Sequence, residues 1–207
     1  MHIDNTFATD HDVRVLRELP NGPLQRHFFP PVRSGGRDGI LVHVTPNRAV
    51  PWVGQFAFGD LGSQVSGVFS LPQPEHIAVV AKGAGYIVPI CRPADWSAID
   101  IRPVRQVKVS RQLGFVLFSD WTRIAAYSSQ GLAWISERLC WDDLNVLTIE
   151  NATVKCSGHD PTDSLNPIFP SAVAFNKIRA TIPIIPQIRH NRNLPMELIM
   201  LYNIARL

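Results

Sequence analysis

The chain has 207 residues, of which 45% are hydrophobic and 18% charged, a composition that excludes a disordered protein and is typical of a globular one. This length suits one domain or one duplicated domain, able to bury about two-thirds or more of its unfolded surface. Seventeen prolines and 13 glycines predict many turns and few long helices.

Location is predicted from the N-terminus, the hydropathy and the cysteines. The first 20 residues are charged and lack the apolar core of a secretory signal. No apolar run of about 20 residues occurs, so no membrane span is expected. Cys91, Cys140 and Cys156 are odd in number and widely spaced, which argues against a disulfide framework. We therefore expect a cytoplasmic protein.

The net charge of +3 is unevenly distributed. Residues 174–207 contain five basic side chains and one acidic one, whereas the preceding residues contain 15 basic and 16 acidic ones. The main body is therefore almost neutral, and the C-terminal part is basic. A nucleic-acid-binding domain usually carries a basic face on its folded body, so no nucleic-acid partner is predicted.

The N-terminal part is predicted to be an extension, residues 1–34, with one short helix over residues 10–19. Residues 40–45 are mostly apolar and mostly β-branched, which predicts a buried strand. Residues 51–58 are predicted to pair with that strand as a hairpin.

A repeated pattern of strands and turns follows, in two units at about residues 67–109 and 114–156. Ile77 of the first unit corresponds to Ile124 of the second, at a nearly constant offset that also relates several other pairs. The other pairs are Gly83 with Gly131, Tyr86 with Trp134, Trp96 with Trp141, and Val107-Lys108-Val109 with Val154-Lys155-Cys156.

The predicted fold class is all-β. The domain, residues 35–175, is interpreted as duplicated antiparallel four-stranded meanders, packed face to face as a sandwich or curled into an open barrel. Residues 176–207 form a basic and apolar tail, in which the apolar residues after Pro195 predict a short C-terminal helix.

Catalytic and metal-binding patterns are weak. The chain has no Gly-x-Ser-x-Gly elbow and no phosphate-binding glycine loop. Cys156 and His159 are one pair of zinc-type ligands, but a structural zinc site needs two more. Asp142-Asp143 is interpreted as a turn, and Asp160 with Asp163 lacks the spacing of a calcium loop. We therefore predict no enzyme activity, no cofactor and no metal.

The five tryptophans are the remaining candidates for a binding site. Most are expected to fill the core between sheets, and Trp134 and Trp141 are interpreted as framework because each has an aromatic counterpart in the other repeat. Trp121 follows Asp120 in a predicted turn and is, of the five, the one predicted to be exposed. The candidate binding residues are therefore Asp120, Trp121 and Arg123.

The segments Asp120–Tyr127 and Trp134–Leu144 contain a D-W-x-x-I-x-A-Y strand and a W-x-S-x-R-L-x-W-D-x-L motif. In these segments the chain resembles a group of uncharacterised bacterial all-β proteins, over about residues 35–175, and departs from the group after Phe175. The resemblance implies a bacterial source and no catalytic residue.

Two functions remain open. The first is a non-enzymatic protein-interaction module with a protein partner, in the manner of an immunity protein. The alternative is a β domain that binds carbohydrate or a small ligand through Trp121. The oligomeric state is left open.

Overall fold

The computed structural model describes residues 1–32, 38–62, 65–150, 153–159 and 177–183, of which residues 150 and 177–183 are described by their backbone alone. Within these ranges the chain is all-β, with one short 3-10 helix, and its strands form four sheets. The predicted fold class is therefore confirmed. The predicted C-terminal helix lies outside the described residues, and no helix within them could span a membrane.

The first sheet has the strand order β2-β4-β5-β3. Strand β4 is antiparallel to both β2 and β5, and β3 is parallel to β5. Its strands are β2 (His11–Leu16), β3 (Gln25–Phe29), β4 (Gly39–Pro46) and β5 (Trp52–Ala57).

The second sheet has the order β1-β6-β7-β8-β9. It is an antiparallel meander except that β1 joins β6 in parallel. Its strands are β1 (His2–Asp4), β6 (Gly67–Ser70), β7 (His76–Ala81), β8 (Ala84–Pro89) and β9 (Ser97–Ala98), with the 3-10 helix η1 (Pro93–Asp95) before β9.

The third and fourth sheets are antiparallel meanders with the orders β10-β11-β12-β13 and β14-β15-β16. Their strands are β10 (Gln106–Ser110), β11 (Phe115–Ser119), β12 (Ile124–Ser128), β13 (Gly131–Ile135), β14 (Asp142–Glu150), β15 (Thr153–His159) and β16 (Lys177–Pro183).

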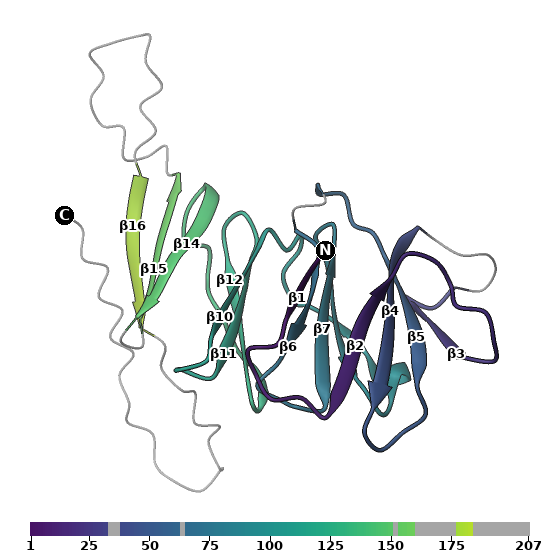
Figure 1. The fold of residues 1–207 in the computed structure, drawn as a ribbon. Helices are drawn as coiled ribbons and strands as arrows, with labels where there is room; N and C mark the ends of the chain where they lie inside the picture. The colour runs from purple at the N-terminus through teal and green to yellow at the C-terminus, as the bar shows by residue number, and fades with distance from the viewer. Residues whose placement is uncertain (33–37, 63–64, 151–152, 160–176, 184–207) are drawn as a thin grey trace, which may run out of the picture.

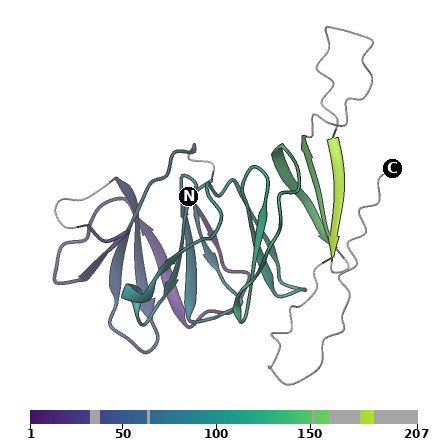
Figure 2. The same cartoon turned by 180° about the vertical axis from the view of Figure 1, so that it is seen from behind.

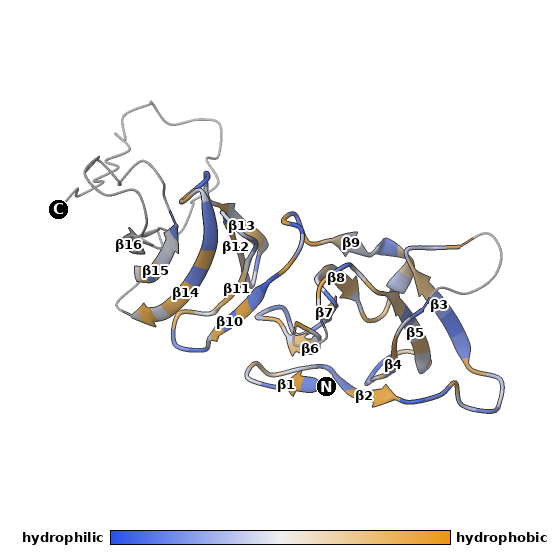
Figure 3. Cartoon of the chain, turned by 90° about the horizontal axis from the view of Figure 1, so that it is seen from above, coloured by the Kyte–Doolittle hydropathy of each residue, from blue (hydrophilic) through white to orange (hydrophobic). Residues whose placement is uncertain are grey.

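The four sheets stand side by side in an open row, from the first sheet at one end to the fourth at the other (Figure 1, and from behind in Figure 2). Three apolar cores lie between successive sheets. The predicted face-to-face packing of meanders is therefore present, extended from two layers to four. Seen from above, apolar and polar residues alternate along several strands (Figure 3).

Burial on one or both faces explains why some strands have apolar residues at every position and others only at every second position. Strands β7 and β11 lie in the two middle sheets, and all residues of β11 and the last five of β7 are buried. Strand β4 lies in an end sheet, and its buried residues alternate with half-buried ones. A strand packed on both faces needs apolar side chains at every position, whereas a strand packed on one face needs them at every second position.

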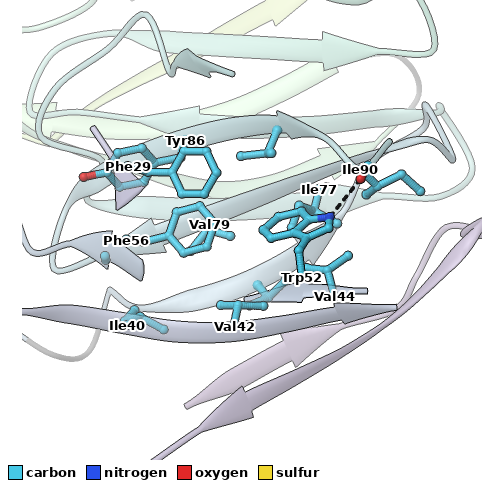
Figure 4. Close-up of a cluster of buried hydrophobic side chains, with 13 residues drawn as sticks. Phe29, Ile40, Val42, Val44, Trp52, Phe56, Ile77, Val79, Tyr86 and Ile90 are labelled. Carbon is cyan, nitrogen blue, oxygen red and sulfur yellow. Dashed lines mark hydrogen bonds between the residues drawn. The ribbon is translucent and has the colours of Figure 1, made fainter. Parts of the chain in front are cut away.

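The core between the first and second sheets is built around Trp52, which is almost fully buried (Figure 4). Its Nε1 donates a hydrogen bond of 2.9 Å to the carbonyl oxygen of Ile90. Phe29 stacks on Phe56 with 4.5 Å between ring centroids, and the Tyr86 hydroxyl donates to the Ala57 carbonyl. The polar ends of the large rings are thus satisfied inside the core.

The N-terminal residues differ from expectation. The predicted helix over residues 10–19 is wrong, because His11–Leu16 is strand β2. Val13 and Val15 pack against the first core with a period of two, and pairing with β4 satisfies the backbone. Residues 1–34, predicted to be an extension, supply β1, β2 and β3 to the first two sheets.

The two predicted repeats each contain a hairpin with a two-residue turn, β7–β8 and β12–β13. Gly83 and Gly131 both have φ of +87°, a left-handed conformation that glycine adopts without strain. However, Ile77 lies in the core between the first two sheets and Ile124 in the core between the last two. The duplication itself stays a prediction.

Candidate functional site

The candidate residues lie in the loop between β11 and β12, where the third sheet meets the fourth. The segment between β13 and β14 runs beside this loop. Leu139 donates its backbone N–H to the carbonyl of Thr122, at 2.8 Å, and Leu144 donates to the carbonyl of Trp121, at 2.9 Å. These two bonds hold the loop and the segment together, so residues distant in sequence share one surface.

Asp120 organises the loop from inside. Its side chain is buried, with a residue exposure of 4%, and Oδ1 accepts hydrogen bonds of 2.7 Å from the backbone N–H groups of Thr122 and Arg123. Oδ2 accepts from Nε and Nη2 of Arg123 at 3.2 and 3.1 Å. Both carboxylate oxygens are therefore occupied, and Asp120 positions the loop. The partly exposed guanidinium of Arg123 is held at its edge.

Trp121 projects from this loop with 38% of its surface exposed. The guanidinium carbon of Arg105 lies 3.5 Å from the centre of the Trp121 ring. Arg105 also forms an ion pair with Oδ1 of Asp143, at 3.4 Å. The indole is thus fixed by a cation on one face, and the cation is fixed by a carboxylate.

Trp141 forms a second aromatic and cationic pair nearby. It is 58% exposed, and the guanidinium carbon of Arg138 lies 4.9 Å from its ring centre. Arg138 also donates hydrogen bonds to the carbonyl oxygens of Cys140, at 3.0 Å, and Trp141, at 2.6 Å. The expectation that Trp121 is exposed is therefore confirmed, whereas the interpretation of Trp141 as framework is wrong.

Packing explains the difference between Trp141 and its predicted counterpart Trp96. Trp96 packs on Tyr86 and Phe29, with ring centroids 5.7 and 5.9 Å apart. Trp141 immediately precedes β14, after the chain has left the third sheet. It therefore has no neighbouring aromatic core to enter, and its ring faces solvent.

We define the Arg–Trp surface as the group formed by these two stacks and the carboxylate of Asp143 that binds Arg105. Chemically it offers two flat apolar faces bordered by hydrogen-bond donors, a combination suited to contact rather than to bond breaking. Its members are Arg105, Trp121, Arg138, Trp141 and Asp143.

The cysteine beside this surface is not activated. Burial raises the pKa of the Cys140 thiol, which therefore stays protonated near neutral pH. Its Sγ donates to the carbonyl oxygens of Asp142, at 3.3 Å, and Trp121, at 3.6 Å. Cys140 thus adds a further link between loop and segment.

The cysteine, histidine and aspartate residues considered as metal ligands do not come together among the described residues. Cys156 is buried in β15, and His159 ends the same strand three residues later; an odd separation directs side chains to opposite faces. Among the described residues no group of three His, Cys, Asp or Glu side chains could hold a metal. Asp160 and Asp163 lie outside the described residues. Asp142 and Asp143 belong to strand β14 and not to the predicted turn, although Asp143 has a left-handed φ of +55° where the pairing with β15 is irregular.

Two small hollows lie among the described residues, and neither is at the candidate site. The better formed of two hollows lies between the first two sheets, lined in part by Asp4, Thr9 and His11, and its internal volume is about 10 Å³. That volume holds about one water molecule. The Arg–Trp surface is not part of either hollow.

Sequence reasoning found Trp121 but missed Arg105, Arg138 and Trp141. Arg105 approaches Trp121 only because β10 pairs with β11, which brings Arg105 N–H to the Ser119 carbonyl at 2.7 Å. No sequence spacing signals that contact. Trp141 and Arg138 are close in sequence, so their pairing was open to prediction from local spacing.

Comparison with known proteins leaves the family open: no protein-family model matches the chain, and no characterised protein matches it significantly in sequence. Function is therefore argued from the site.

Proposed function

We propose that the protein is a non-enzymatic interaction module that binds a protein partner through the Arg–Trp surface. The observation that carries the proposal is that Trp121 and Trp141 are both exposed and each lies beneath an arginine guanidinium. Trp and Arg are the residues most enriched among those that dominate binding energy at protein interfaces.

Pre-organisation supports the same proposal. The loop that carries Trp121 is held by the buried carboxylate of Asp120, and Arg105 is held by Asp143. Side chains that are already ordered lose less conformational entropy when a partner binds. A surface of fixed aromatic rings is therefore better suited to tight contact than the same rings on a loose loop.

The proposed role is that of a bacterial protein that binds another protein. The sequence resembles uncharacterised bacterial all-β proteins, and we extend the proposal to an immunity-like role in which this chain covers or neutralises another protein in the cytoplasm. The surface presents guanidinium donors beside apolar rings. A complementary partner would therefore present carboxylates or carbonyl groups around an apolar or aromatic centre.

The alternative function is binding of a carbohydrate or small ligand. It is favoured by one observation, the exposed indole of Trp141, because sugar rings stack on flat aromatic faces. Binding to a glycan array that is lost in Trp141→Ala would support this alternative over a protein partner.

The main proposal is tested by partner capture followed by measurement with purified components. The tagged full-length protein is used for affinity purification from the native host, and the recovered protein is produced separately for calorimetry. Trp121→Ala and Trp141→Ala are each expected to weaken Kd by about tenfold or more. Leu147→Ala is the control, because Leu147 on β14 is similarly exposed, at 44%, and lies outside the Arg–Trp surface.

Two results would contradict the proposal. One is that no protein is recovered specifically from the native host. The other is that both tryptophan variants bind the recovered protein with the same Kd as the wild type.

A further inference from the structure

Strand β13 is the last strand of the third sheet, and in the described part of the chain it pairs only with β12. Ser136 donates its N–H to the Ile124 carbonyl, at 2.8 Å. Because backbone groups alternate in direction along an antiparallel strand, the N–H and C=O of Ile135 point away from β12. Ala133 sits at an irregularity and has no register partner on β12.

In the two preceding sheets the corresponding edge is covered. Strand β5 is covered by β3 in the first sheet, and β8 by β9 in the second. The hairpins β7–β8 and β12–β13 both close with two-residue turns, so β13 occupies the place of β8. Figure 3 shows β9 and β13 along the same side of the row. Strand β9 pairs with the outer edge of β8, and no strand among the described residues pairs with the outer edge of β13.

The side chains of β13 also suit an added strand. Leu132 and Ile135 are 37% and 40% exposed. They pair with Tyr127 and Ala125, which belong to the core between the second and third sheets, so both lie on that face. Natural edge strands are usually protected by lysine, proline or inward charges, and the sequence of β13, GLAWI, contains none of these.

A polar group on β13 is also left without a partner. Nε1 of Trp134 is buried and has no hydrogen-bond acceptor among the described residues. Buried indole N–H groups normally have a partner. Trp134 packs against the core between the third and fourth sheets, so this N–H lies beside the edge strand and not on its open backbone.

We propose that β13 receives an extended segment of the protein partner as an added antiparallel strand. This inference rests on the proposed function and names how the partner binds. The strand β9 serves as the template: its backbone pairs with Tyr86 and Ile87 of β8, and Ile99 and Ile101 beyond it enter the core. The partner segment is therefore extended, free of proline where it pairs, and apolar at alternate positions.

The first test uses a synthetic peptide with the sequence of residues 94–101, ADWSAIDI, added to the isotopically labelled full-length protein. In the free protein the Ile135 amide is expected to exchange with solvent at least about 100-fold faster than the Ala126 amide. The peptide is expected to shift the resonances of β13 and to slow Ile135 exchange about tenfold or more. A peptide with Ser97→Pro and Ala98→Pro is the control and is expected to have no effect.

Three outcomes of this test overturn the proposal. Slow exchange of Ile135 in the free monomer means that the edge is already occupied. Unchanged β13 resonances at millimolar peptide mean that it does not accept a strand. A dimer by light scattering that Ile135→Lys converts to monomer means that a second copy of the chain is the occupant.

The second test separates this inference from the proposed function. Leu132→Lys combined with Ile135→Lys places charges on the edge, and Leu147→Lys on β14 is the matched control. With the purified partner, the double variant is expected to weaken Kd about tenfold or more and the control to leave it unchanged. If Trp121→Ala loses binding while the double variant binds fully, strand addition is refuted. The proposed function is not contradicted by that result. Full binding by Trp121→Ala, Trp141→Ala and the double variant would refute the proposed function.

Discussion

The guanidinium of Arg105 lies 3.5 Å from the centre of the Trp121 ring, and this contact joins the start of the third sheet to the loop between its second and third strands. Arg105 is also bound to Asp143 on the fourth sheet. One arginine therefore links two sheets and orders one of the two indoles proposed to contact the partner.

Replacement of Arg105 tests how much this stack contributes. Arg105→Ala removes a partly exposed cation–π contact and a solvent-screened ion pair, so the free energy of unfolding is expected to fall by about 0.5–1.5 kcal/mol. Urea denaturation measures this, and Arg105→Lys, which keeps the charge without the planar stack, should recover only part of it. A loss above about 3 kcal/mol would contradict a surface role for Arg105.

Replacement of Asp120 tests the organisation of the loop. Asp120→Ala leaves the N–H groups of Thr122 and Arg123 without their acceptor and removes the partner of the Arg123 guanidinium. The expected loss is about 2–4 kcal/mol of unfolding free energy. Asp120→Asn keeps an oxygen acceptor for the two N–H groups and should cost less. Equal stability of the alanine variant and the wild type in urea would show that the carboxylate does not hold the loop.

Replacement of tryptophans tests which rings belong to the core. Trp52→Phe shortens a buried ring and leaves the Ile90 carbonyl without its hydrogen bond, at an expected cost of about 2–4 kcal/mol. Trp141→Phe, at the exposed surface, should change stability by less than about 0.5 kcal/mol. Similar losses for the two variants in thermal or urea unfolding would contradict the assigned positions.

Acidification should destabilise the protein through buried histidines. Burial lowers the pKa of His11, His27 and His76 below the ordinary value of 6.5. Between the lowered folded pKa and 6.5 the unfolded chain binds more protons than the folded one, so unfolding becomes easier as pH falls. Stability is therefore fully present above about pH 7 and declines below 6.5.

The measurement is the urea midpoint between pH 7.5 and 5.5. His11→Gln is expected to reduce the decline, because His11 is the most deeply buried of the three. Leu147→Gln, at an exposed position of β14 that carries no titratable group, is the control and should leave the pH dependence unchanged. A midpoint that does not move with pH in the wild type would contradict the expectation.

The sequence by itself determined the all-β class and the positions of most strands between residues 40 and 150. These follow from local properties, since β-branched and apolar runs bounded by Gly, Pro and Asn favour strands whatever surrounds them. It also placed Trp121 on a turn, because Asp120 is followed by the residues of a tight loop.

Only the tertiary structure decided the rest. Residues 11–16 carry a stripe that suits a short helix as well as a strand, and pairing with β4 selected the strand. The pairing of β10 with β11 brought Arg105 to Trp121, and the departure of the chain into the fourth sheet left Trp141 exposed and the edge of β13 uncovered. Such contacts depend on which strands become neighbours. The neighbours of each strand are determined by the burial of whole sheet faces across the row, and local spacing in the sequence does not predict them.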